Sequence, residues 1–168
     1  MANQATLVVI KPDTIQRGLI GAVLARLDSL QLECLGAKAV RVSRALAEAH
    51  YQNIKDKPFF TETVEYLQGK FHDTTYVLAF VLWGPDAVER VRQVAGATHP
   101  ERADPRSLRG AFGRMRSSGL MENVLHASST PAEAEREIAL WFNPGELLEP
   151  PAPHPARAAR GSPLRRSQ

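Results

Sequence analysis

Segments typical of β-strands and of α-helices alternate along most of the chain, and this alternation is the feature that most limits its fold. Residues 6–10 form an unbroken β-branched and aliphatic run, which is typical of a buried strand. Residues 18–30 then carry apolar side chains at helical spacing. The full predicted order is β-α-β-α-α-β-α-loop-β-α, which predicts a sheet layer with helices packed on it.

The later elements are predicted from the same patterns, together with proline and glycine signals. We predict strands at 32–42, 74–83 and 123–128, and helices at 44–54, from Phe59 to near Gly69, from Pro85 to near Ala95, and at 131–142. Residues 96–120 show no clear period and include six glycines and prolines. A loop of this length inside a compact domain is usually functional.

The charge is distributed unevenly along a chain of otherwise ordinary composition. The net charge is +3, but residues 150–168 hold four arginines and no acidic residue, so residues 1–149 carry −1. A nearly neutral body is not the electrostatic footprint of a nucleic-acid-binding domain. We predict one domain at 1–149 and a disordered, proline-rich basic tail at 150–168. The tail is either an arm for RNA, anionic lipid or an acidic partner, or a solvated extension.

Several well-known sites and signals are absent from the sequence. It has no GxxxxGK[ST] phosphate loop, no GxGxxG fingerprint and no HExxH metal motif. The single Cys34 excludes an internal disulfide and a CxxC site, and we expect a reduced thiol packed in a strand. The apolar stretch 7–10 is far too short for a signal or membrane segment, so we expect a cytoplasmic protein with no membrane partner.

His126 lies in the last predicted strand, and the helix that follows offers it a carboxylate. The apolar stripe of this helix includes Ala134 and Trp141, and Glu137 falls within it. Because a buried carboxylate is costly unless it is bonded, Glu137 is a candidate partner for the imidazole. It would fix one tautomer and leave the other ring nitrogen free to attack. The alternative is a satisfied core histidine and a helix carboxylate that reaches solvent.

Positively charged residues precede the histidine in the chain. Arginines flank the Gly/Pro-rich loop and stand on the helix before it, namely Arg92, Arg102, Arg106, Arg109, Arg114 and Arg116. Arginine is a preferred partner for phosphate because its guanidinium is planar and always charged. Lys11 directly follows the first strand, at a position where α/β sheets usually carry ligand sites. Taken alone, these residues are explained equally well as solvated arginines and an ordinary strand-end turn.

Seven short segments, taken together, make the chain resemble the nucleoside diphosphate kinase family. In order they are VIKPD at 9–13, HY at 50–51, KDKPFF at 55–60, GATHP at 96–100, SLRG at 107–110, NVLHAS at 123–128 and EIALWF at 137–142. Each is weak alone, but seven in this order are highly specific, and the match covers about residues 5–148. The resemblance implies an α/β (α+β sandwich) fold with a ferredoxin-like βαββαβ core. Its sheet is antiparallel, with helices packed on it and a long loop before the last strand.

The resemblance also implies roles for individual residues. His126 corresponds to the nucleophile that accepts the phosphoryl group, Glu137 to the carboxylate that orients it, and Ser128 to the neighbouring hydroxyl. Tyr51 completes the implied catalytic set and lies near the nucleotide phosphates.

The implied nucleotide-binding residues surround each part of the ligand. Lys11, Arg92, Thr98 and Arg109 correspond to groups around the phosphates, Lys11 and Asn123 to contacts with the sugar hydroxyls, and Phe59 to the aromatic against the base, with Leu120 on its other face. The implied cofactor is Mg²⁺, carried mainly by the phosphates of the nucleotide, so no protein ligand to a metal is named.

This chain departs from the common family pattern at four places. It has a few extra residues between Arg109 and Asn123, and a few more between Phe60 and Thr75. Glu122 stands where glycine or arginine is usual. Ala-Ser-Ser follows the histidine, where Gly-Ser-Asp is usual.

The function implied is transfer of the γ-phosphoryl group from a nucleoside triphosphate, typically ATP, to a nucleoside diphosphate through a phosphohistidine on His126. Stacking on Phe59 reads no hydrogen-bonding edge, so the pocket should accept different bases. A homo-oligomer, either a tetramer or a hexamer, is also implied. Two alternatives remain open: a family member that binds nucleotide without turnover, and a regulatory or nucleic-acid-binding α/β module whose arginines and tail meet RNA or a partner.

Overall fold

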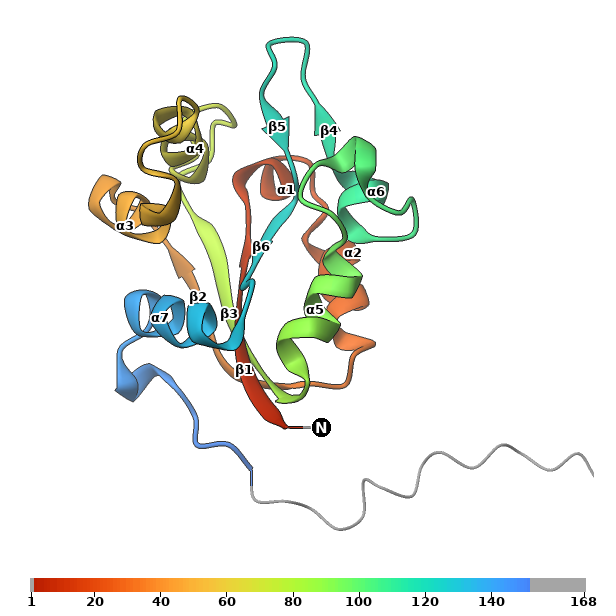
Figure 1. Ribbon diagram of the computed structural model, residues 1–168, viewed down its shortest axis with the longest axis vertical. Helices are drawn as coiled ribbons and strands as arrows, with labels where there is room; N and C mark the ends of the chain where they lie inside the picture. Colours follow the sequence, from red (N-terminus) through yellow and green to blue (C-terminus); the bar gives the residue numbers. More distant parts are fainter. Residues whose placement is uncertain (1, 152–168) are drawn as a thin grey trace, which may run out of the picture.

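A computed structural model of the chain describes residues 2–151 and confirms the antiparallel sheet with helices packed on it (Figure 1). The predicted tail lies outside the described residues, apart from residues 150 and 151. The strands are β1 (Asn3–Ile10), β2 (Glu33–Val40), β3 (Val77–Pro85), β4 (Arg114–Met115), β5 (Met121–Glu122) and β6 (Leu125–Ala127). Four of them form one sheet in the order β2-β3-β1-β6, and β4 and β5 form a separate hairpin.

Helices cover both faces of the four-stranded sheet (Figure 1). One face carries α2 (Ile20–Asp28), α5 (Ala87–Ala95) and α6 (Leu108–Phe112), and the other carries α3 (Arg44–His50), α4 (Phe60–Leu67) and α7 (Pro131–Trp141). The short α1 (Pro12–Gln16) directly follows β1, and three 3₁₀ helices lie at Gln52–Ile54, Pro100–Arg102 and Pro144–Glu146. None of the described helices has the length and apolar character needed to cross a bilayer.

The central strand β1 contributes to a separate hydrophobic core on each face of the sheet. Leu7 and Val9 pack in the core beneath α3, α4 and α7, whereas Val8 and Ile10 pack in the core beneath α2, α5 and α6. This follows from the two-residue period of a strand, whose successive side chains point to opposite faces. A strand buried on both faces reads as a continuous apolar run, as residues 6–10 do.

The prediction that Pro85 begins a helix was wrong. Pro85 is the last residue of β3 and pairs with Asn3 of β1, and α5 begins only at Ala87. Asp86 makes the turn between the two elements with a left-handed backbone, at a φ of 49°. The pairing of β3 with the start of β1 therefore extends the strand past the local helix signal.

The prediction that residues 96–120 form a loop was also wrong in part. This segment contains a 3₁₀ turn, α6 and β4, which are elements of five residues or fewer and show no readable period. The predicted helix 44–54 ends at His50 and continues as a 3₁₀ turn, and the last strand is shorter than predicted. Cys34 lies in β2 as expected, but it is exposed rather than packed.

Candidate active site

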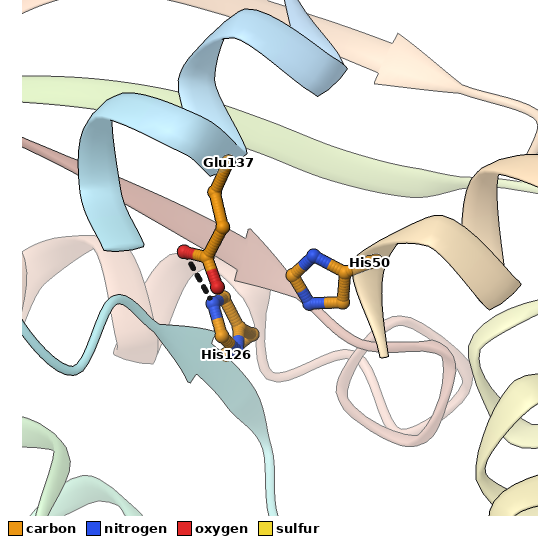
Figure 2. Close-up of side chains that lie close together, drawn as sticks. All are labelled: His50, His126 and Glu137. Carbon is orange, nitrogen blue, oxygen red and sulfur yellow. Dashed lines mark hydrogen bonds and ion pairs between the residues drawn. The ribbon is translucent and has the colours of Figure 1, made fainter. Parts of the chain in front are cut away.

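His126 is placed by β6 on the face of the sheet that α3 and α7 cover. Its neighbours Leu125 and Ala127 pack in the opposite core, so the alternation of the strand turns His126 toward Glu137 on α7 (Figure 2). Nε2 of His126 lies 2.9 Å from Oε2 of Glu137. Because an ionised carboxylate can only accept, this nitrogen carries the proton, and Nδ1 is left with its lone pair.

Glu137 is itself held in place by Ser128 and by the start of its helix. The Glu137 residue is 3% exposed, and Oγ of Ser128 donates to its Oε2 at 2.7 Å. At the start of α7, Oγ1 of Thr130 accepts a hydrogen bond from the backbone N–H of Glu133 at 3.2 Å. The pattern of residues 130–133 thus fixes where the helix begins, and the helix phase then turns Glu137 inward.

His50, on α3, packs edge-to-face against His126 (Figure 2). The two ring centroids lie 4.3 Å apart, with an angle of 81° between the ring planes. Nε1 of Trp141 donates to Nδ1 of His50 at 3.1 Å, which leaves the proton of the neutral ring on Nε2. Burial, followed by the neighbouring His126, holds the pKa of His50 well below its ordinary value. His50 is therefore a neutral ring that fixes the plane of His126.

The same three side chains are the site's candidate metal ligands. His50, His126 and Glu137 bring ligand atoms within 4.8 Å of one another. Two imidazoles suit zinc or copper rather than Mg²⁺, which prefers oxygen ligands. The carboxylate of Asp13 is already bound by protein donors, because Oδ1 accepts from Tyr66 at 2.5 Å and Oδ2 accepts from the N–H of Val124 at 3.2 Å.

Lys11, Thr98 and Asn123, which are far apart in the sequence, meet through hydrogen bonds. Nζ of Lys11 donates to Oδ1 of Asn123 at 2.6 Å, and Nδ2 of Asn123 donates to the carbonyl oxygen of Thr98 at 3.1 Å. Lys11 is only 6% exposed. Burial, followed by the charge of Arg109, lowers the pKa of Lys11 to about 7.

Arg109 clamps the beginning of the long loop to the last strand. Its guanidinium donates to the carbonyl oxygens of Asn123, Gly96 and Leu125 at 3.3, 2.8 and 2.9 Å. Gly96 has a φ of 84°, and a Cβ there would lie 2.2 Å from Oγ of Ser107, so only glycine fits this turn. Burial, followed by the charge of Arg92, lowers the pKa of Arg109 to about 10. A guanidinium has five N–H donors, so donors remain for an anionic ligand.

The electrostatic environment of His126 is positive, although the ring is neutral. Burial, followed by the charges of Lys11 and Arg109, holds the pKa of His126 well below its ordinary value. Arg92 and Arg136 add to this effect. Arg92 is exposed on α5 and also lines an open pocket of about 580 Å³, together with Gly96 and Thr130. His126 is not among the residues that line this pocket, so the positive surroundings, and not the pocket, mark the candidate site.

The remaining predicted residues differ in how much of their surface is exposed to a ligand. The hydroxyl of Tyr51 is buried with no partner among the described residues, and its ring packs edge-on against His50. Burial raises the pKa of Tyr51. Phe59 is 51% exposed, whereas Leu120 is only 6% exposed, so Phe59 offers a base far more surface.

Apart from Arg109, the predicted arginines of the long loop are not among the charges that bear on His126. The side chain of Arg106 is 92% exposed and pairs with Asp104, while Arg114 and Arg116 pair with Glu122. Of the six predicted arginines, Arg92 and Arg109 are the two among the charges that bear on His126, to which Lys11 and Arg136 also belong.

Three residues that contribute to this geometry were missed by the sequence analysis. His50 was part of a matching segment but received no role, and the Asp13–Tyr66 pair was not recognised. These contacts join residues 53 or more positions apart, for example Tyr66 to Asp13. Asp13 holds the N–H of Val124, a β-branched residue with an unfavourable φ of 74°. No local sequence pattern predicts such a contact.

Fold and site together define a class, an α+β sandwich whose neutral, carboxylate-bound imidazole lies among cations suited to phosphate. A family model described as nucleoside diphosphate kinase matches residues 4–147. A nucleoside diphosphate kinase of Pyrococcus horikoshii is 45% identical over 89% of this chain and 91% of its own length. One of Thermus thermophilus is 43% identical over 86% of this chain and 99% of its own.

Solved structures give the same result. The chain is similar to a transition-state mimic of nucleoside-diphosphate kinase from Borrelia burgdorferi with bound vanadate and ADP. That match has a TM-score of 0.79, 33% identity, and coverage of 89% of this chain and 93% of the other. A halophilic nucleoside diphosphate kinase from Halobacterium salinarum in complex with CDP matches with a TM-score of 0.79, 38% identity, and coverage of 90% and 95%. The chain therefore belongs to the nucleoside diphosphate kinase family, and it is a phosphotransferase.

Proposed function

We propose that the protein transfers the γ-phosphoryl group of a nucleoside triphosphate, typically ATP, to a nucleoside diphosphate through a phosphohistidine on His126. One observation carries this proposal: a neutral imidazole has Nε2 bound to Glu137 and lies among the charges of Lys11, Arg109 and Arg92. Such surroundings attract a phosphate while leaving the nucleophile uncharged. Membership of the family supports the same reaction.

In the first half-reaction, Nδ1 of His126 attacks the γ-phosphorus in line with the bond to the leaving oxygen. The N–P bond forms, the P–O bond to the β-phosphate breaks, and the nucleoside diphosphate leaves with that electron pair. Glu137 accepts a hydrogen bond from Nε2 throughout and stabilises the charge that develops on the ring. Ser128 keeps Glu137 in position. A terminal oxygen of a second diphosphate then attacks the phosphohistidine by the reverse path.

The other predicted residues are proposed to position and neutralise the nucleotide. Lys11, Arg92, Arg109, Tyr51 and Thr98 would contact the phosphates, since phosphoryl transfer depends mainly on positioning and charge stabilisation. Lys11 and Asn123 would meet the sugar hydroxyls, and Phe59 would stack on the base. The cofactor Mg²⁺ would be held by the phosphates and would neutralise part of their charge. The engagement of Asp13 and Glu137 with protein donors supports this arrangement.

Intact-mass spectrometry under non-acidic conditions tests this proposal. The protein is mixed with ATP and Mg²⁺ without an acceptor, and a gain of one phosphoryl group, about 80 Da, is expected. The gain should disappear on addition of GDP, and it should not form in His126→Ala. Bound nucleotide without a mass gain would instead indicate a family member without turnover. If the protein neither gains the phosphoryl group nor binds the nucleotide, the proposal is contradicted outright.

We also infer a homo-oligomer, either a tetramer or a hexamer, in the cytoplasm. β2 and β6 are the edge strands of the described sheet, and an exposed edge is a surface at which chains can pair. Light scattering coupled to size-exclusion chromatography gives the mass directly, and a monomer would contradict the inference.

A further inference from the structure

Two segments that overlap the stretches where the sequence predicts extra residues lie against each other. They are residues 69–76, which follow α4, and residues 114–122, which form the β4–β5 hairpin and project beyond the sheet (Figure 1). We call them together the accessory lobe. Nη1 of Arg116 in the hairpin donates to the carbonyl oxygen of Phe71 at 3.3 Å, so the two segments are in direct contact.

Glu122 joins the two parts of the accessory lobe. Its side chain is 0% exposed, and Oε1 lies 2.8 Å from Nε2 of His72. Oε2 accepts from Nε of Arg114 at 2.5 Å, and Nη1 of Arg116 lies 3.7 Å from Oε1. A buried carboxylate is tolerated only where such donors surround it. Glu122 is thus a fully paired buried carboxylate.

This cluster extends to Asn123, the next residue in the chain. The ring of His72 packs against Tyr66, with centroids 5.3 Å apart. The hydroxyl of Tyr66 accepts from the backbone N–H of Asn123 at 3.3 Å and donates to Asp13. The side chain of Asn123 in turn bonds Lys11 and the backbone of Thr98. A continuous set of contacts therefore joins Glu122 to the residues proposed to bind the sugar.

We propose that Glu122 is a positioning residue that anchors the accessory lobe and thereby holds Asn123 for the sugar hydroxyls of the nucleotide. This inference rests on the proposed function. The bonding partners of Glu122 within residues 2–151 belong to the accessory lobe, whereas His126 is held by Glu137 and His50. Glu122 therefore acts on nucleotide binding and not on the chemistry at His126.

The substitution Glu122→Gln keeps the size of the side chain but removes its charge and brings an amide N–H toward donors. We expect KM for a ribonucleoside diphosphate to rise about tenfold, with kcat nearly unchanged, because charge-assisted bonds anchor the lobe. A 2′,3′-dideoxynucleoside diphosphate has no sugar hydroxyls, so its KM should differ little between variant and wild type. The matched control is Glu62→Gln, an exposed glutamate in α4, which should leave both KM values unchanged.

Acetyl phosphate, which has neither sugar nor base, separates positioning from general damage. Its rate of phosphorylating His126, followed by intact mass, should be the same in Glu122→Gln and wild type. An unchanged ribonucleotide KM, an equal rise for the dideoxynucleotide, or a lost reaction with acetyl phosphate would each overturn the inference. Failure of the proposed function would be recognised separately, because the wild type itself would then take no phosphoryl group from ATP.

A milder variant keeps the test decisive if Glu122→Gln does not fold. Arg114→Gln removes one donor to Glu122, and the arginine side chain is 50% exposed, so folding should be preserved. We expect the same selective rise in KM, but smaller. A wild-type KM in a variant whose Arg114–Glu122 bond is gone would overturn the inference.

Discussion

Two histidine–glutamate pairs lie within residues 2–151, and their local geometry is nearly the same. Nε2 of His126 lies 2.9 Å from Glu137, and Nε2 of His72 lies 2.8 Å from Glu122. Each pair joins segments that are distant in the chain or lie on different elements. A search for histidines bound to buried carboxylates would find both.

The pairs differ in what surrounds them. The side chain of His126 is 19% exposed, whereas those of His72 and Glu122 are 0% exposed. Nδ1 of His72 is buried with no partner among residues 2–151, so no substrate can reach it. Two arginines pair with Glu122, Arg114 at 2.5 Å and Arg116 at 3.7 Å, whereas Glu137 has one longer contact, with Arg136 at 3.9 Å. Lys11 and Arg109 also bear on His126. A carboxylate fixes a tautomer in both places, but an accessible second nitrogen among cations is needed for chemistry.

Replacing the two histidines gives the largest expected contrast. His126→Ala should lower phosphoryl transfer by more than about 10³-fold, because the nucleophile is gone. His72→Ala should keep kcat close to wild type but lower the free energy of unfolding by roughly 2–4 kcal/mol, since it leaves a cavity and an underpaired Glu122. Coupled kinetics and urea unfolding measure both effects. If His72→Ala lost turnover as His126→Ala does, the distinction between the pairs would be wrong.

Replacing the two glutamates should likewise affect different kinetic parameters. Glu137→Gln keeps the shape of the site but no longer stabilises charge on His126, and it should lower kcat by roughly 10²-fold. Glu122→Gln, the matched change in the other pair, should act on KM instead. Saturation kinetics on both variants separate the parameters, and a shared loss of kcat would contradict the assignment.

The charge of Lys11 should make nucleotide capture dependent on pH. Its pKa is lowered to about 7, so the free enzyme loses this positive charge as the pH rises through that value. The ratio kcat/KM should therefore fall by roughly tenfold toward pH 9, whereas it should hold on the acid side because the pKa of His126 lies well below its ordinary value. Lys11→Met should have a lower kcat/KM at every pH, and its kcat/KM should not fall further toward pH 9. An identical fall in that variant would assign the titration to another group.

The smallest expected effect concerns the start of α7, which carries Glu137. Thr130→Ala removes the cap from the N–H of Glu133 and should lower the free energy of unfolding by about 1 kcal/mol. Ser43→Ala removes the equivalent cap of α3, which carries His50. Thermal unfolding compares the two variants. A large loss of turnover in either variant would mean that the helix caps position the site more strongly than packing in the two hydrophobic cores does.

The first pair could be predicted from the sequence and the second could not, for a physical reason. Glu137 falls in the apolar stripe of a long helix, so periodicity alone turns it inward beside the strand that precedes it. Glu122 lies in a two-residue strand, and its partner His72 is 50 positions away in an irregular segment. Elements this short show no period, so both the hairpin and α6 were read as loop. The resemblance predicted Lys11, Asn123 and Arg109 as nucleotide-binding residues, but it did not predict the carbonyl contacts that occupy much of Arg109.

The three-residue strand β6 also determines where the chain can change in length. Leu125 and Ala127 face one core and His126 faces the other, so inserting a single residue between Val124 and His126 would exchange the two sets. The histidine would then enter the apolar layer beneath α5, and a leucine or alanine would take its place beside Glu137. Residues added before Glu122 cause no such exchange, because a hairpin can lengthen without shifting the strand after it. Variation in length is tolerated at the turn of the hairpin, while the few residues around His126 must keep their count.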